Sequence, residues 1–243
     1  MITIRVYRAD LDRFCAKACF SVLNEAEKQR AAGVSNRAAR HEFVKTRALL
    51  RLLLSKHTGR PASALRFATG ASGKPVLPGL HGVHFNVSHS DGTALIAIAS
   101  AEVGLDIERI DGSVDYPGVA ESIFSCSEIE MLRNAPKARR GEVFFSIWTR
   151  KEAYLKATGA GFSSDLPMIS TASSHGVIED RGCTFGFHAW HTFDLPALAN
   201  FKAALVTRAK DCKIDFVDVA DMAHMPVHNA IPAAAGACAF SPA

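Results

Sequence analysis

The sequence predicts an α+β fold made of two mixed halves that join near residues 100–110. Three observations lead to this prediction. A helical pattern of apolar residues occupies residues 35–57, short alternating segments typical of strands follow over residues 84–107, and helical spacing then returns before short strands that run to about residue 218. The chain has 243 residues, of which 48% are apolar, so it can form one or two hydrophobic cores and is too apolar to be disordered.

The first sixty residues are predicted to form one strand and two helices. Residues 1–5 have the pattern of a strand, and residues 21–32 that of a short helix. A longer helix is predicted from an N-cap at Ser35 to His57, where Gly59 stops it. Its core stripe consists of Val44, Ala48, Leu49, Leu52 and Leu53. Arg40, Arg47 and Arg51 recur at helical spacing on another face, which is typical of a solvated surface.

The later elements follow from changes in period. Residues 84–88, 93–99 and 103–107 are predicted to form an antiparallel meander. Ser127 and Glu130 have the spacing of a capping box, so a helix is expected to start there. Another helix is expected over about residues 141–157. We predict an N-terminal half at residues 1–102, a C-terminal half at 103–220 and a flexible tail at 221–243.

Charge is distributed unevenly along the chain. Residues 1–60 contain 13 Lys and Arg against 5 Asp and Glu, a net charge of +8, whereas the remainder contains 15 against 19, a net charge of −4. A locally basic region indicates an anionic ligand or an acidic protein partner more than a nucleic-acid-binding module, in which positive charge is usually more widespread.

The cellular setting is predicted from what the sequence lacks. Its apolar runs are far shorter than the roughly 18 residues of a membrane span, and no secretion signal is visible. The six cysteines, at positions 15, 19, 126, 183, 212 and 238, include no C-x-x-C pair and no zinc spacing, so they are read mostly as reduced core thiols. We therefore expect a soluble, cytoplasmic protein.

The segment V-G-L-D-I-E at residues 103–108 is the first candidate for chemistry. Strand alternation places Gly104, Asp106 and Glu108 on one face. Two like charges at this spacing repel, so they are usually either solvated or used to hold a hard cation such as Mg²⁺, and the solvated reading is the commoner one.

Two further segments carry candidate residues. In W-T-R-K-E-A-Y-L-K at residues 148–156, Glu152 and Lys156 have the spacing of an ordinary surface ion pair, but the neighbouring Trp148 indicates a carboxylate held at the rim of a packed face. In F-N-V-S-H-S at residues 85–90, small polar residues around His89 suit a phosphate, although a lone histidine in a turn is more often structural.

Several common motifs are excluded. Gly73-Lys74-Pro75 is not a Walker A loop, because Pro75 replaces the required Ser or Thr. The chain contains no G-x-G-x-x-G, no H-E-x-x-H and no G-x-S-x-G, which removes the usual dinucleotide, zinc-protease and serine-hydrolase readings.

Taken in order, G-K-P, F-N-V-S-H-S, V-G-L-D-I-E, F-S-x-x-E and W-T-R-K-E-A-Y-L-K resemble the motifs of the Sfp-type 4′-phosphopantetheinyl transferases over about residues 25–156. The resemblance implies a pseudo-twofold pair of similar α+β halves with the active site between them. It also implies holo-[acyl-carrier-protein] synthase activity, in which phosphopantetheine passes from coenzyme A to a serine of an apo acyl or peptidyl carrier protein. Adenosine 3′,5′-bisphosphate is then released, and a role in secondary metabolite biosynthesis is expected.

The same resemblance implies site residues. Asp106, Glu108 and Glu152 match the Mg²⁺ ligands, Glu152 is also the expected general base, and Lys156 is expected to contact the reacting phosphate. The remaining residues expected to bind coenzyme A are Lys28, Arg30, Lys74, Ser88 and His89. Family members vary around Lys28 and Arg30. The expected partner is an acidic carrier protein, with no nucleic acid and no membrane, and the chain is expected to be a monomer.

Three alternative functions remain open. One is a coenzyme A or nucleotide-binding protein without turnover, and another is a nucleic-acid-binding module that uses Arg40, Arg47 and Arg51. The third is a Mg²⁺-dependent phosphohydrolase, which would release product without a protein acceptor.

Overall fold

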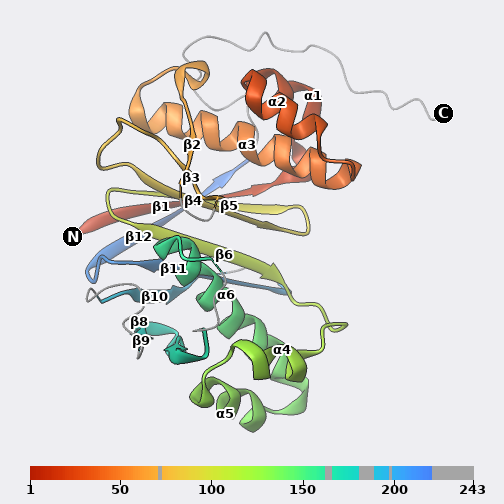
Figure 1. Cartoon of the computed structure of the whole chain (residues 1–243), viewed down its shortest axis with the longest axis vertical. Coiled ribbons are helices and arrows are strands. Elements are labelled where there is room, and N and C mark those ends of the chain that lie inside the picture. The colour runs from red at the N-terminus through yellow and green to blue at the C-terminus, as the bar shows by residue number, and fades with distance from the viewer. Residues whose placement is uncertain (71–72, 162–165, 181–188, 197–198, 221–243) are drawn as a thin grey trace, which may run out of the picture. The chain divides into compact units, whose positions relative to one another are not determined.

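Figure 1 shows the computed structural model of the chain, which describes residues 1–70, 73–161, 166–180, 189–196 and 199–220. Runs of helices and runs of strands follow one another along the chain, as the α+β prediction requires. The chain divides into two compact units: Met1–Ala9 with Arg66–Asp218, and Asp10–Leu65 with the residues from Val219 onward. The predicted boundary at residue 102, and the pseudo-twofold relation of the two halves, stay predictions.

The larger unit contains two four-stranded sheets, with strand orders β12-β1-β5-β4 and β6-β11-β10-β8. The first sheet is formed by β1 (Ile2–Asp10), β4 (His84–Ser90), β5 (Thr93–Ala99) and β12 (Cys212–Val219). The second is formed by β6 (Val103–Arg109), β8 (His175–Val177), β10 (His191–Asp194) and β11 (Phe201–Thr207). Two small ladders pair β2 (Ala68–Thr69) with β3 (Pro75–Val76) and β7 (Ile169–Ser170) with β9 (Glu179–Asp180).

The predicted meander is correct for its first two strands and wrong for the third. β4 and β5 pair antiparallel, from His84 opposite Ala99 to Ser90 opposite Thr93. β6 pairs instead with β11, far along the chain, with Ala204 opposite Asp106. The chain therefore leaves the first sheet after β5 and starts the second sheet with β6.

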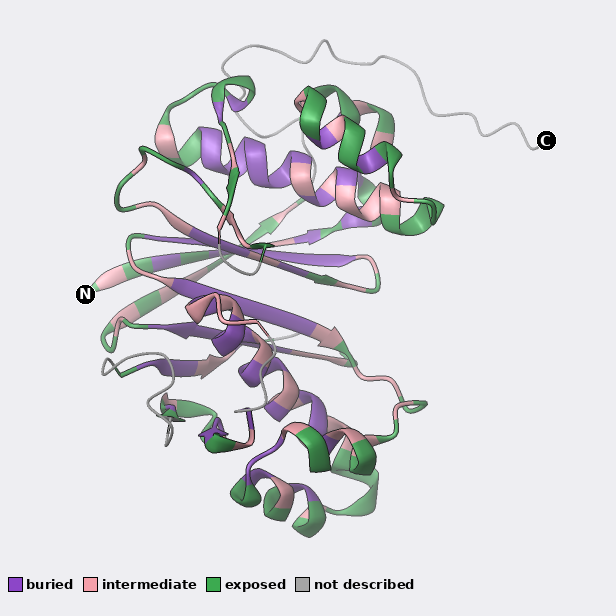
Figure 2. Ribbon diagram, in the orientation of Figure 1, coloured by how far each residue is buried: buried purple, intermediate pink, exposed green. Residues whose placement is uncertain are grey.

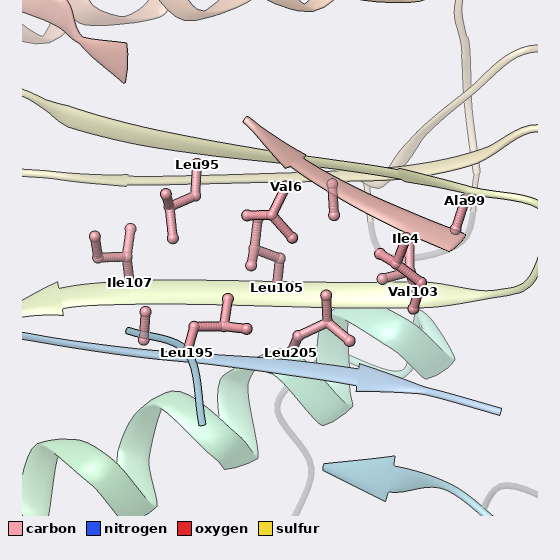
Figure 3. Packing of buried hydrophobic residues seen from close by; sticks show 11 residues of the cluster. Ile4, Val6, Leu95, Ala99, Val103, Leu105, Ile107, Leu195 and Leu205 are labelled. Atoms are coloured by element: carbon pink, nitrogen blue, oxygen red, sulfur yellow. The ribbon is translucent and has the colours of Figure 1, made fainter. Parts of the chain in front are cut away.

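A single apolar layer fills the space between the two sheets. Figure 3 shows Val103, Leu105 and Ile107 of β6 facing Val6 of β1 and Leu95 of β5. All five side chains are at most 2% exposed, and Figure 2 shows β5 buried along its whole length. The alternation predicted for β6 is confirmed, because its odd-numbered residues line this layer.

The helices of the larger unit are α4 (Tyr116–Ile123), α5 (Cys126–Asn134) and α6 (Arg140–Thr158), with short 3₁₀ turns at Lys137–Arg139 and Leu166–Met168. α6 lies against the second sheet, where Tyr154 and Leu155 pack with Ala204 and Val206 of β11. It ends at Gly159, whose left-handed backbone, with φ of 73°, accommodates the reversal of the chain.

The capping box predicted at Ser127 and Glu130 is wrong by two residues. Ser125 is the N-cap of α5, and the Glu128 side chain returns a hydrogen bond to the Ser125 backbone nitrogen at 2.7 Å. Both serines have a glutamate three residues later, so the local pattern alone does not distinguish them.

The smaller unit is helical. Its elements are α1 (Ala16–Val22), α2 (Glu25–Ala32) and α3 (Arg37–Thr58), with 3₁₀ turns at Leu11–Arg13 and Ala62–Ala64. The single helix predicted over residues 21–32 is therefore wrong, because α1 already ends at Val22 and Asn24 then caps a second helix through a capping box with Glu27. α3 matches its prediction closely, with Asn36 as N-cap rather than Ser35.

The arginines of α3 do not form a solvated face. Arg51 is fully buried, and its guanidinium lies 2.7 Å from the Glu27 carboxylate and donates to the carbonyl oxygens of Ala62 and Leu65. Arg47 is largely buried and also faces Glu27, at 3.7 Å. Arg51 therefore ties α2 and the turn after α3 to α3 itself, and the nucleic-acid-binding alternative loses its surface.

The cysteine prediction is only partly right. Among the cysteines that the structure describes, Cys15 and Cys126 are exposed and Cys212 is half-buried, so Cys19 alone is a core residue, and burial raises its pKa to about 12. Cys183, Cys238 and the predicted tail at 221–243 lie outside the described residues. Within the described ranges, no helix is both long enough and apolar enough to cross a membrane.

Candidate active site

The site begins where α6 crosses β6. Gly104 is the contact point: a Cβ atom there would lie 2.8 Å from the Cα of Ala157 and closer still to the backbone of both Ala153 and Ala157. Only a residue without a side chain lets the helix approach this closely. Gly104, on the same face of β6 as Asp106 and Glu108, therefore determines how close α6 lies to these carboxylates.

This close approach brings Lys156 of α6 against Asp106 of β6. The Lys156 ammonium lies 2.5 Å from Asp106 Oδ1 and donates to the Ser88 hydroxyl oxygen at 3.1 Å. Ser88 in turn donates to Asp106 Oδ1 at 2.8 Å. The predicted surface ion pair between Glu152 and Lys156 is thus replaced by a buried contact from Lys156 to the strand.

Asp106 is 1% exposed, and its second oxygen, Oδ2, is buried without a hydrogen-bond partner in the described part of the chain. A buried carboxylate oxygen without a donor is costly, because it has lost water and gained nothing. The solvated-face reading of Asp106 is therefore wrong.

Three carboxylates share this region. Burial raises the pKa of Asp106, Glu108 and Glu152, and repulsion between the carboxylates adds to the effect at Glu108 and Glu152. For Glu152 burial and repulsion by Asp106 and Glu108, opposed by Lys156, raise the pKa to about 7. The cluster carries more negative charge than its single lysine balances, which is the electrostatic setting in which a cation binds.

These residues fit Mg²⁺ in their chemistry more than in their present geometry. Across residues 1–220 with their gaps, no three His, Cys, Asp or Glu side chains are already gathered at metal-binding distances. The donor chemistry does fit: all three groups are carboxylates, the ligands that Mg²⁺ prefers, and Asp106 Oδ2 is an acceptor without a partner. A divalent cation would balance the excess negative charge, so the residues suit the ion although they are not preassembled around it.

Part of the chain is similar to a known enzyme family. The sequence profile of the 4′-phosphopantetheinyl transferase superfamily matches residues 102–206, somewhat less than half of the chain, and this range contains Asp106, Glu108, Glu152 and Lys156.

Individual relatives agree with the profile. The 4′-phosphopantetheinyl transferase HetI of Nostoc is 36% identical over 128 residues, 51% of this chain and 54% of the relative. The transferase psf-1 of Bacillus pumilus is 37% identical over 126 residues, 52% of this chain and 53% of the relative. A putative 4′-phosphopantetheinyl transferase of Synechocystis is 27% identical over 202 residues, 81% of each chain. In the first two, the matched region spans about half of the relative's length.

The F-N-V-S-H-S segment is arranged differently from its prediction. All six residues belong to β4, and the turn follows at Asp91 and Gly92. Ser88 is buried and faces Asp106, whereas His89 is exposed on the opposite face of the strand. The two residues therefore do not share one turn.

Lys74 lies in the same unit as the carboxylates, beside α6. Its ammonium donates to the carbonyl oxygens of Lys156 at 2.7 Å and Val103 at 3.2 Å, and burial lowers its pKa to about 8. Lys74, Glu152 and Lys156 line one cavity of about 240 Å³. Another cavity, of about 430 Å³, is lined by Glu108, Trp148, Phe144 and Phe145.

Lys28 and Arg30 belong to the smaller unit, on α2. Lys28 pairs with Glu25 at 2.7 Å, and Arg30 lies over the ring of Phe43 at 5.2 Å from its centroid. Both cations are engaged within their own helical unit.

Sequence reasoning placed Trp148 beside the wrong carboxylate and missed Lys151. Trp148 donates a hydrogen bond to Glu108, although its position one turn before Glu152 indicated a contact with that residue. Lys151, next to Glu152, is buried and pairs with Glu128 at 2.9 Å. A lysine within an apolar helical stretch, and a glutamate three residues after an N-cap serine, were the available signals.

Proposed function

We propose that the protein transfers 4′-phosphopantetheine from coenzyme A to a serine of an apo carrier protein and releases adenosine 3′,5′-bisphosphate. The observation that supports this most directly is the centre formed by Lys156, Asp106 and Ser88, with Glu108 and Glu152 beside it. Similarity to the 4′-phosphopantetheinyl transferases supports the reaction class.

In this proposal Asp106, Glu108 and Glu152 hold Mg²⁺. The ion would neutralise charge on the pyrophosphate of coenzyme A and orient it for attack. Asp106 enters with one oxygen unpartnered, and its other oxygen is shared with Lys156 and Ser88.

Glu152 takes the hydroxyl proton of the carrier serine while the serine oxygen attacks the phosphorus that bears the pantetheine arm. The new serine oxygen–phosphorus bond forms as the phosphorus–bridging oxygen bond breaks, and the bridging oxygen leaves with adenosine 3′,5′-bisphosphate. Lys156 stabilises negative charge at the phosphorus and on the departing oxygen.

The rest of coenzyme A is assigned by chemistry. The cavity beside Glu108 has aromatic walls from Phe144, Phe145 and Trp148, which suit the uncharged pantetheine arm. For the phosphates and the nucleotide we propose Lys28, Arg30, Lys74, Ser88 and His89. Of these, Ser88 lies against Asp106, so its contribution would be made at the reacting centre.

The wider setting remains as the sequence predicts it. We propose two pseudo-twofold halves, residues 1–102 and 103–220, although β12 of the later half joins the sheet of the earlier one. We also propose a cytoplasmic monomer that acts on an acidic acyl or peptidyl carrier protein, without nucleic acid or a membrane.

The test is intact-protein mass spectrometry of an apo carrier protein incubated with this protein, coenzyme A and Mg²⁺. The expected result is a mass gain of one phosphopantetheine, absent when EDTA replaces Mg²⁺. Adenosine 3′,5′-bisphosphate released without a carrier would indicate a phosphohydrolase instead. Coenzyme A binding in calorimetry without any carrier modification, across several carriers, would indicate a protein that only binds.

A matched variant tests the base. Glu152→Gln keeps the shape of the side chain but removes its basicity, so we expect the transfer rate to fall by about 10²–10⁴-fold. Coenzyme A affinity, measured by calorimetry, should change much less. A Glu152→Gln protein with the unaltered rate would remove Glu152 from this role.

A further inference from the structure

The outer strand of the first sheet meets the outer strand of the second through side chains. β4 and β6 are edge strands of different sheets and share no backbone ladder. Instead, three alternate side chains of β4 accept hydrogen bonds from three alternate backbone nitrogens of β6. The bonds run from Leu105 N to Asn86 Oδ1 at 2.9 Å, from Ile107 N to Ser88 Oγ at 3.4 Å and from Arg109 N to Ser90 Oγ at 3.1 Å.

These backbone bonds determine which way the serine hydroxyls point. A backbone N–H can only donate, so each serine oxygen accepts from it and keeps its single proton for another acceptor. In both cases that acceptor is a carboxylate of β6: Ser88 donates to Asp106 Oδ1 at 2.8 Å, and Ser90 donates to Glu108 Oε2 at 2.9 Å.

The geometry points to Ser90 as a positioning residue that fixes the Glu108 carboxylate for a divalent cation. This inference rests on the proposed function, because it takes Glu108 as a metal ligand. Glu108 is held from two sides, by the Ser90 hydroxyl of β4 and the Trp148 indole of α6. Groups that orient a ligand in this way commonly change metal affinity by 10–100-fold when they are removed.

Ser90 offers a cleaner test than Ser88. Ser88 also accepts a hydrogen bond from Lys156, so its removal would disturb the lysine as well as Asp106. The Arg109 nitrogen that Ser90 accepts from is exposed, so water can replace the hydroxyl there. Removing the Ser90 hydroxyl therefore acts mainly on Glu108, which loses a half-buried hydrogen bond.

The experiment measures Mn²⁺ binding directly by calorimetry, with coenzyme A present, on the full chain. Ser90→Ala is expected to bind Mn²⁺ about tenfold more weakly than the wild type. Ser90→Thr keeps the hydroxyl and suits a strand, so it should restore the affinity. Ser173→Ala, which removes an exposed hydroxyl that donates to the His175 carbonyl oxygen, should bind as the wild type does.

Asn86, the third β4 side chain that bonds to the β6 backbone, provides a control that separates positioning of Glu108 from loss of stability. Asn86 accepts from the buried Leu105 nitrogen and donates to neither carboxylate in the bonds described above, so Asn86→Ala should lower the melting temperature without weakening Mn²⁺ binding by the folded protein. Ser90→Ala should weaken Mn²⁺ binding and leave the melting temperature nearly unchanged.

Two results overturn the inference. Equal Mn²⁺ affinity in Ser90→Ala and the wild type would show that the hydroxyl does not position Glu108, while leaving the proposed transfer reaction intact. No Mn²⁺ binding by the wild type, with or without coenzyme A, would remove the metal site itself, and with it the metal-dependent part of the proposed function.

Discussion

Helix α6 carries two lysines five residues apart, each paired with a buried carboxylate, and the two pairs are built differently. Lys151 donates to Glu128 and to the carbonyl oxygens of Leu166 and Ile169, and it is 3% exposed. The Glu128 carboxylate also accepts from Thr171 and from the backbone of Ser125. Every polar atom of this pair is matched to a partner.

The Lys156–Asp106 pair is incomplete by comparison. Its lysine is about one-third exposed, and Asp106 Oδ2 has no partner among the described residues. A fully satisfied buried pair holds parts of the chain together, whereas a pair with an unused acceptor and an accessible cation can still bind a ligand. The comparison teaches that the number of matched partners, more than the presence of charge, separates the structural pair from the chemical one.

The largest expected effect concerns the incomplete pair. Asp106→Asn keeps the shape but removes a ligand charge, so carrier modification should fall by at least about a hundredfold. Since burial already disfavours the Asp106 charge, the melting temperature should stay the same or rise. Mass spectrometry and calorimetric unfolding measure the two quantities, and a large loss of stability without loss of activity would reverse the comparison.

The complete pair should respond in the opposite sense. Lys151→Met leaves the buried Glu128 charge without its partner, which typically costs about 3–5 kcal/mol of folding free energy. Urea unfolding measures this cost. Lys156→Met is the matched control on the same helix, and it should lose activity with a much smaller loss of stability. Similar losses of unfolding free energy in both variants would mean that the two ion pairs contribute equally to stability, against the comparison.

A smaller change should affect both properties together. Gly104→Ala adds a methyl group where the α6 backbone leaves no room, so the helix has to move away from β6. We expect a loss of about 1–3 kcal/mol of stability and a lower transfer rate, because Glu152 and Lys156 move with the helix. An unfolding curve that matches the wild type would show that α6 adapts without shifting.

The smallest expected effect is on the pH dependence of stability, through Lys74. Burial lowers its folded-state pKa from 10.5 to about 8, so between these values the unfolded chain binds more protons than the folded protein, and stability rises with pH. Relative to Lys74→Met, the free energy of unfolding of the wild type should increase by about 1–2 kcal/mol between about pH 7.5 and 9.5. Urea unfolding at both pH values measures this, and a gain that runs towards lower pH would contradict a buried Lys74.

Local periodicity predicted the elements that form the candidate site. The alternation in β6 gave the correct faces for Leu105 and Asp106. Helical spacing placed Glu152 and Lys156 on one helix, and the predicted bounds of that helix differ from those of α6 by about one residue at each end. The motif order pointed to the same superfamily whose profile matches residues 102–206. These features depend on neighbours in the sequence, which is why the sequence reveals them.

Features set by distant partners were not predictable in this way. A strand alternates identically whichever strand it pairs with, so nothing local indicated that β6 leaves the sheet of β4 and β5. Helical spacing likewise does not show whether Arg51 faces water or Glu27, which lies on another helix. Ser125 and Ser127 have the same capping-box pattern, and the choice between them is decided by Lys151 and Thr171, which hold Glu128.

The strand order β12-β1-β5-β4 also bears on how the protein is made. β1 (Ile2–Asp10) is synthesised long before one of its two neighbours, β12 (Cys212–Val219), and Arg8 of β1 is paired with Asp218 at 2.6 Å. Until the ribosome has released that strand, one edge of β1 stays open to other strands, and closing so long a loop is slow. The first sheet is therefore completed only after nearly all of the described chain has been synthesised. Until then the free edge of β1 can pair with a strand of another molecule, so correct folding requires that β12 pairs with β1 first.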